Sequence, residues 1–451
     1  LKSRGLGDVY KRQIEESPPP LTPTNDDARR TLGIDSLHAA PYNLDGSGVR
    51  LLVFDGGRVQ DHAGMSGRIT YLDGSDFIDH ATHVAGTAAG SGASSPGGRD
   101  LKGVAPAASI FSAGFQPLSG ILFWSNAGDI QSDYATARNV YDVDLVTNSL
   151  GSNTAPNGYD CDLEGDYGVS SSLLDGIVRG DNVAVGSPFV TIWANGNERF
   201  GLSHRGRCGS NYATTAPPSC AKNPIHVGAT NSDGDSMTRF SSWGPCDDGR
   251  LKPVVSGPGC ESGRVNGEDS IYSTLTGNTY GGMCGTSMAT PAVAGVVSLA
   301  IQQYRQTVGN PGARPSNALM KAWLIHTARD LGTDGPDYGY GYGEVDAVSA
   351  IDLIKTPSSY TTDSISQGRT DTHTYQVPSG ATELKLTLAW DDYAAAPFAA
   401  NAVVNNLNLE MVSPGGAVYY PFSLNPSNPH LPATVSGPNS LDNQEQVIVP
   451  N

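Results

Sequence analysis

The sequence is poor in charged residues, and above all in basic ones. Of 451 residues, 16% are charged, and 28 Lys and Arg face 45 Asp and Glu, which gives a net charge of −17. Such a chain offers no basic surface for a nucleic-acid backbone, so nucleic acid is not an expected partner. We interpret the acidic excess as solvated surface charge, with cation binding at a few sites as the alternative.

Long apolar runs are also missing. No stretch of about 18 apolar residues occurs, so we expect no membrane span and no membrane partner. No signal-peptide pattern is visible, but Leu1–Gln13 contains no Met and joins poorly to the acidic, Pro-rich stretch after it. We interpret this beginning as a cloning or sequencing remnant, so it counts little against secretion.

Cysteine is scarce, and its spacing excludes some chemistry. None of the six cysteines forms a C-x-x-C pair, which disfavours zinc and thioredoxin-type sites. An even number in a secreted protein favours disulfides, with free buried thiols as the alternative. Cys208 and Cys220 lie close together in a polar loop and are the bridge that we expect.

Short apolar runs and helical stretches alternate over residues 31–356. The runs are rich in Val and Ile and predict strands at Val49–Phe54, Ser109–Ser112, Leu145–Thr147, Phe189–Trp193 and Ile225–Val227. Between them, helices are predicted around Thr82–Ala89, Ile130–Tyr141 and Ser170–Ile177. This alternation predicts an α/β domain of three layers, with a mainly parallel sheet covered on both faces.

The segments before and after residues 31–356 have a different pattern of apolar and polar residues. Residues 1–30 precede the alternating pattern as an extension. After residue 356, Leu384, Leu386 and Leu388 alternate with polar residues, which is the pattern of half-buried antiparallel strands. We therefore expect a β-sandwich or barrel over residues 357–451, with its last hairpin cut short after Val447–Val449.

Four polar residues follow or precede predicted elements in a way that suits acyl transfer by serine. Ser287 precedes a helix that is apolar all round, Asp55 and Asn197 follow apolar strands, and His80 begins a helical stretch. Each also has an ordinary explanation. A serine before a helix is commonly an N-cap, Asp and Asn beside Gly are commonly turns, and His80 with His83 could be structural.

In the chain order Asp55, His80, Asn197 and Ser287, however, the sequence resembles the subtilase family. Gly285-Thr286-Ser287-Met288-Ala289-Thr290-Pro291 carries the most specific part of that resemblance. His80 matches the first His of the family's His-Gly-Thr-His-Val-Ala-Gly segment, and Asn197 matches the Asn of Ala-Gly-Asn-Glu. With its trailing β region, the chain is most similar to bacterial alkaline subtilases that carry a C-terminal β-barrel.

The resemblance implies a secreted, extracellular serine endopeptidase that acts on proteins or peptides. Asp55, His80 and Ser287 would form the catalytic triad, and Asn197 would help to hold the oxyanion. Ser149-Leu150-Gly151 matches the segment that pairs with substrate as an added strand. No cofactor is implied for catalysis, although structural calcium is, and Asn231–Asp235 is an acidic loop that could serve. We expect a monomer. We also expect a mature form or a fragment, because too few residues precede the domain for an inhibitory pro-domain.

Three residues depart from the family pattern. Gly56 replaces a Ser or Thr that can bind the catalytic carboxylate, so we expect Asp55 to be fixed less firmly. Ala81 replaces a Gly and is tolerated only where φ is negative. Cys284 either braces the nucleophile loop through a disulfide or leaves a thiol open to oxidation.

Two other functions remain open at this point. One is a catalytically silent, subtilase-like binding protein. The other is a metal hydrolase that uses His80 and His83, although the His-Glu-x-x-His zinc pattern is absent.

Overall fold

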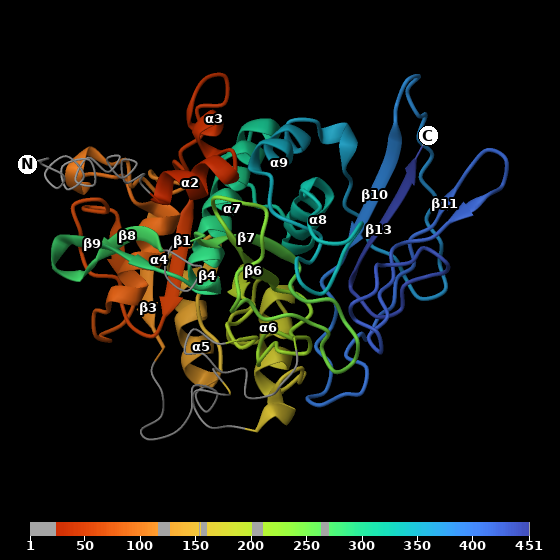
Figure 1. Ribbon diagram of the computed structural model, residues 1–451, viewed down its shortest axis with the longest axis horizontal. Helices are drawn as coiled ribbons and strands as arrows, with labels where there is room; N and C mark the ends of the chain where they lie inside the picture. The colour runs from red at the N-terminus through yellow and green to blue at the C-terminus, as the bar shows by residue number, and fades with distance from the viewer. Residues whose placement is uncertain are drawn as a thin grey trace, which may run out of the picture.

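A parallel sheet forms the centre of the protein (Figure 1). The computed structural model describes residues 24–115, 127–152, 154, 160–200, 211–262 and 270–450, so that Leu1–Gln13 and Cys208 lie outside it. The seven strands are ordered β2-β3-β1-β4-β5-β6-β7, and all neighbours are parallel. Their bounds are Arg50–Asp55 for β1, Ile69–Tyr71 for β2, Ser109–Gly114 for β3, Leu145–Asn148 for β4, Val190–Ala194 for β5, Ile225–Asn231 for β6 and Val255–Cys260 for β7.

The two faces of the sheet bury different apolar clusters, because side chains alternate along each strand. Leu51 and Val53 of β1 pack with α4 (Asp79–Ala89) and α7 (Thr286–Val308). Leu52 and Phe54 pack on the opposite face with α5 (Ala127–Ala135) and α6 (Val169–Arg179). The expected three-layer α/β architecture is therefore confirmed.

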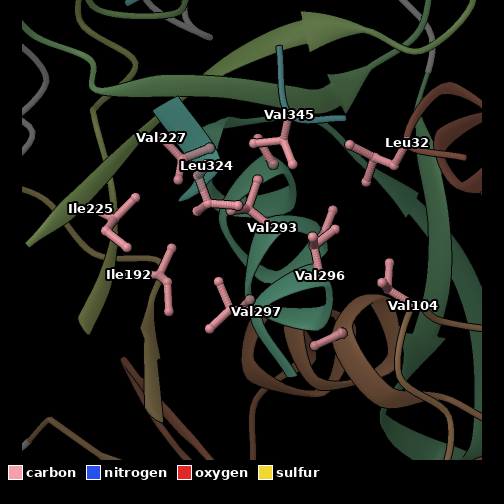
Figure 2. Packing of buried hydrophobic residues seen from close by; sticks show 14 of the residues in the cluster. Leu32, Val104, Ile192, Ile225, Val227, Val293, Val296, Val297, Leu324 and Val345 are labelled. Atoms are coloured by element: carbon pink, nitrogen blue, oxygen red, sulfur yellow. The ribbon is translucent and has the colours of Figure 1, made fainter. Parts of the chain in front are cut away.

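Helix α7 runs through the larger cluster. Val297 lies on the side of Ile192 of β5 and Ile225 of β6, and Val296 lies on the opposite side, towards Val104 (Figure 2). Four more helices add apolar residues to this cluster: α2 (Thr24–Thr31), α3 (Ile34–His38), α8 (Asn317–Thr327) and α9 (Ala347–Ile354). No helix among the described residues is long and apolar enough to cross a membrane.

A hairpin and one of two disulfides lie beside the start of α7. Strands β8 (Ile271–Leu275) and β9 (Thr279–Met283) pair antiparallel, and β8 packs on α4. One disulfide joins Cys260 to Cys284, directly before α7, and another joins Cys220 to Cys246. The predicted Cys208–Cys220 bridge is therefore wrong. Proximity in sequence is a poor guide to pairing because loop closure costs little more for longer loops.

The C-terminal region contains separate antiparallel pairs, as predicted (blue in Figure 1). Strand β10 (Glu383–Ala389) pairs with β13 (Gln444–Pro450), and β11 (Met411–Val412) pairs with β12 (Val418–Tyr419). Strand β10 packs on α8. The domain boundaries at residues 30 and 356 stay predictions.

Buried polar contacts join this region to the sheet region. Asp391 accepts hydrogen bonds from Asn317 Nδ2 (2.8 Å) and Ala318 N (3.1 Å) at the start of α8. Asn223 receives the Asp392 N–H on its Oδ1 (2.8 Å) and donates from Nδ2 to the Asp392 carbonyl (2.7 Å). The two regions are thus held together by specific polar partners.

Candidate active site

Asp55 is the last residue of β1, the third strand of the sheet from the β2 edge. It is 1% exposed. Its Oδ1 accepts hydrogen bonds from the Gly56 N–H (2.7 Å) and from His80 Nδ1 (2.8 Å). Its Oδ2 is buried and has no hydrogen-bond partner among the described residues. No hydroxyl binds the carboxylate among the described residues, and whether Asp55 is fixed less firmly for that reason stays a prediction.

His80 lies in the first turn of α4, and its side chain is 36% exposed. Because Nδ1 donates to Asp55, the ring presents an unprotonated Nε2 as an acceptor. Burial lowers the pKa of His80, but the charge of Asp55 and its hydrogen bond outweigh that effect and raise the pKa above its ordinary value. The pair is thus arranged to accept and hold a proton.

His83 has a different role. It is fully buried, and its Nε2 donates to the Ile271 carbonyl of β8 (2.9 Å), which ties α4 to the hairpin. Burial lowers the pKa of His83 to about 3, so the ring is neutral. His80 and His83 bind different partners, and the described residues contain no group of three or more metal-ligating side chains that could hold an ion. The arrangement gives no support to a metal hydrolase.

Ser287 lies in the first turn of α7, one residue inside the helix. The N-cap is Gly285, which has no side chain to accept a capping hydrogen bond, and Ser287 is not the capping residue. Its Oγ donates to the Ser149 carbonyl (3.3 Å), while Ser149 Oγ donates to the Ser287 carbonyl (2.8 Å). Backbone N–H groups of a first helical turn have no acceptor within the helix, which makes this N–H available to an anion.

Asn197 follows β5 and is oriented by the residue before Ser287. Its Oδ1 accepts hydrogen bonds from both the N–H and the Oγ1 of Thr286, each at 2.9 Å. The amide Nδ2 is therefore left to donate elsewhere, and it lies 3.5 Å from where a Cβ on Gly285 would stand. A side chain at position 285 would thus begin in contact with the Asn197 amide. Sequence reasoning missed Thr286 as the orienting group, although the residue is part of the matched motif.

The segment Ser149-Leu150-Gly151 follows β4. The carbonyl of Leu150 accepts a hydrogen bond from Trp193 Nε1 (2.7 Å), so the segment is fixed against β5. Gly151 has open space where a Cβ would stand. These observations fit an accessible strand edge, and pairing with substrate stays a prediction.

All these groups meet at one edge of the sheet. Strands β1, β4 and β5 are parallel neighbours, so Asp55, Ser149 and the segment of Asn197 follow carboxyl ends that point the same way. The structure forms one bonded pair between Asp55 and His80, and another between Ser149 and Ser287. No hydrogen bond joins Ser287 to His80 among those of the described residues. A serine hydroxyl that rotates about one bond can exchange partners, and such contacts are often loose without substrate.

Ala81 and Cys284, the other two departures from the family pattern, both fit the structure. Ala81 lies inside α4 and outside the set of residues with positive φ, so its methyl group is tolerated. Cys284 is paired with Cys260, at the end of β7, so it braces the approach to Ser287 and exposes no thiol.

The acidic loop Asn231–Asp235 does not fit a calcium site. Asp233 Oδ1 accepts a hydrogen bond from the Ser262 N–H (2.8 Å), and Asp235 pairs with Arg329 (2.6 Å). The cavity beside the loop is also lined by Arg30 and Arg329, whose positive charges oppose a cation.

Comparisons with known proteins agree with this geometry. The model of the Subtilase family matches residues 46–343. The serine protease AprX of Bacillus subtilis is 29% identical over 68% of this chain and 67% of its own length. Subtilisin E of Bacillus subtilis is 32% identical over 70% of this chain and 68% of its own length. The structure of the Clostridium perfringens CspB protease shares the fold, with a TM-score of 0.57 and 16% identity over 73% of this chain and 98% of its own. The chain therefore belongs to the subtilase family of serine proteases.

Proposed function

We propose that this subtilase is a secreted endopeptidase that cleaves proteins through an acyl-enzyme formed on Ser287. The observation that carries the proposal is the bonded pair of Asp55 and His80 (2.8 Å) at the sheet edge where Ser287 opens α7. A carboxylate that fixes the imidazole through Nδ1 leaves Nε2 to act on the nucleophile. Cysteines joined in disulfides suit an extracellular protein.

In the proposed reaction, Ser287 Oγ turns from the Ser149 carbonyl towards His80 and attacks the peptide carbonyl carbon. His80 takes the hydroxyl proton, and Asp55 stabilises the imidazolium. Asn197 Nδ2 and the Ser287 N–H donate to the oxyanion. His80 then gives the proton to the leaving amine, and a water molecule activated by His80 hydrolyses the ester.

The substrate is proposed to lie along Ser149-Leu150-Gly151. An extended peptide that adds to this segment is recognised through its main chain, which suits an enzyme for protein substrates. Besides water, the proposed reaction uses only groups of the protein, and we propose that the enzyme acts as a monomer.

Labelling with a fluorophosphonate tests the assignment. The folded protein should be labelled once and should hydrolyse casein, whereas Ser287→Ala should lose the label. Its kcat should fall by about 10⁶, the loss that a subtilisin shows without its serine. Ser298→Ala is the matched control, because Ser298 is buried in the same helix and its hydroxyl bonds, among the described residues, only to the Ala294 carbonyl (2.9 Å).

Two outcomes would contradict the proposal. Casein hydrolysis by Ser287→Ala would place the nucleophile elsewhere. A folded wild-type protein that neither takes the label nor hydrolyses casein would instead be a silent binding protein.

Calcium as a structural ion stays a prediction with no assigned ligand. It is tested by comparing the melting temperature in millimolar calcium with that in a chelator, and equal values would count against it.

A further inference from the structure

The two segments that carry Asp55 and His80 are tied together at one residue, Arg58. The Arg58 N–H donates to the Asp76 carbonyl (2.7 Å), and the Ile78 N–H donates to the Arg58 carbonyl (3.1 Å). These bonds form a parallel bridge between Arg58 and Phe77. Arg58 lies three residues after Asp55, and Phe77 lies three residues before His80.

The side chain of Arg58 adds a second set of contacts to the same loop. It is 17% exposed, and its Nη1 donates to the Asp73 carbonyl (2.9 Å) while its Nε donates to the Ser75 carbonyl. The guanidinium stacks on Tyr71 and Phe77, with its carbon 5.2 and 4.6 Å from the ring centroids. A planar fork that donates to two carbonyls and stacks on two rings holds one geometry, which an ammonium cannot do.

The far side of this loop is fixed to the sheet. Asp73 Oδ2 accepts a hydrogen bond from the Gly114 N–H at the end of β3 (2.7 Å), and Oδ1 accepts one from the Ser75 N–H (2.9 Å). The loop also presses on the segment after Asp55, since a Cβ on Gly57 would stand 2.6 Å from the Asp76 carbonyl oxygen. The loop between β2 and α4 is therefore clamped between β3 and Arg58.

These contacts around Arg58 matter because few hydrogen bonds hold the Asp55 carboxylate. Only the Gly56 N–H and His80 donate to its Oδ1, and its Oδ2 has no partner among the described residues. Where no neighbouring hydroxyl fixes the carboxylate, the relative position of the two segments decides the Asp55–His80 hydrogen bond. A misplacement of about 1 Å in such a constellation can cost about 100-fold in rate.

We propose that Arg58 is a positioning residue for catalysis, which sets the His80 segment against Asp55 through its carbonyl and aromatic contacts. This inference rests on the proposed function of Asp55, His80 and Ser287. It assigns Arg58 no contact with the substrate.

The test compares Arg58→Lys and Arg58→Ala with the wild type on a chromogenic peptide, per active site titrated with fluorophosphonate. We expect kcat to fall roughly 10- to 100-fold in Arg58→Ala and less in Arg58→Lys, with KM within about twofold. Asp55 raises the pKa of His80, and the other histidine of α4, His83, is neutral. If the contact between Asp55 and His80 is weakened, the pKa of His80 should fall. The acidic limb of the pH profile of kcat should therefore move to lower pH. Arg58→Lys shows this shift best because it keeps the positive charge.

Arg99→Lys is the matched control, since Arg99 stacks on Tyr272 (5.0 Å) and is tied to neither member of the pair. It should keep kcat and its pH profile. A lower melting temperature in Arg58→Lys with unchanged kcat and acidic limb would overturn the proposal and leave Arg58 a purely structural role. A change in KM alone would also overturn it. Activity in Ser287→Ala would instead refute the proposed function, and an inactive Ser287→Ala beside a normal Arg58→Ala would refute only the role of Arg58.

Discussion

The sheet region and the C-terminal region bury different kinds of side chain. The interior of the sheet region holds two large apolar clusters, one on each face of the sheet, besides buried polar groups such as the pair of Asp175 and Lys222. After residue 356, by contrast, the buried residues are largely polar and include Asp392, Asn439, Asp442, Asn443, Gln444, Glu445 and Gln446. Several apolar residues there are exposed, among them Val404, Val412, Val418 and Val435. Non-directional apolar burial builds the first region, and directional polar contacts attach the second.

Asp392, at the contact between the two regions, has several directional polar partners. Asp392 accepts hydrogen bonds from the N–H groups of Val404 (2.7 Å) and Asn405 (3.0 Å). Its Oδ2 also lies 4.0 Å from Nζ of Lys222, which is fully buried in the sheet region. We therefore expect substitutions at the sheet edge to lower kcat, and substitutions at this contact to lower the free energy of unfolding.

The largest expected effect is on the reaction, in Asp55→Asn. An amide holds His80 in the wrong tautomer, and in a triad of this kind kcat falls by about 10⁴. The residual activity should also extend to lower pH, because Asp55 no longer raises the pKa of His80. Steady-state kinetics per titrated site over a range of pH would measure both changes. A loss of less than tenfold would mean that Asp55 does not orient the base.

The next effect is on stability, in Asp392→Ala. This change removes the acceptor of the Val404 and Asn405 N–H groups and a buried carboxylate 4.0 Å from Lys222, which keeps its ion pair with Asp175 (2.7 Å). Unfolding should therefore become easier by about 2–4 kcal/mol. Denaturant unfolding would measure it, and kcat of the folded fraction should stay near the wild-type value. Asp363→Ala is the control, since Asp363 is exposed and contacts only its neighbour Ser364. Equal stability of the two variants would show that the regions are not held by buried polar contacts.

The disulfides allow a comparison of two similar loops. Replacing both cysteines of either pair by Ala should cost about 2–4 kcal/mol, because the sequence separations of 24 and 26 residues are nearly equal. Only loss of Cys260–Cys284 should also lower kcat, since this bridge ends three residues before Ser287. Melting curves and kinetics of the two double variants would separate these effects, and equal kcat values would exclude a role for the bridge in the nucleophile loop.

The smallest effect is expected at the exposed strand residues of the C-terminal region. Val418→Thr in β12 should change stability by less than about 0.5 kcal/mol, because Val418 is 43% exposed. The same substitution at the buried Val227 of β6 places a hydroxyl in the apolar cluster and should cost about 1–3 kcal/mol. Similar costs at both positions would contradict the contrast between the regions.

The sequence predicted what depends on local periodicity and on short motifs. Five strands of the sheet lie within one or two residues of the predicted positions, apart from the longer C-terminal end of β6, because their apolar runs are buried whichever elements cover them. Strands β2 and β7 were missed: β2 has three residues, and the residues of β7, Val-Ser-Gly-Pro-Gly-Cys, form no apolar run. Asp55 and His80 meet as the matched motifs imply.

Contacts that depend on polar partners far apart in sequence could not be predicted. Nothing local marks Asn223 as the partner of Asp392, or Cys246 as the partner of Cys220. The same holds for Arg58, whose partners at Asp73 and Ser75 are near in sequence but are defined only by the path of the loop.

The late position of α7 in the chain has a consequence for when, during synthesis, the proposed catalytic residues are complete. Asp55 and His80 belong to early elements, whereas Ser287 opens a late helix that packs against β4, β5, β6 and β7. A chain that is made from its N-terminus lacks the proposed nucleophile, Ser287, until every strand of the sheet has been synthesised. If Ser287 is the nucleophile, an incomplete chain cannot cleave other chains.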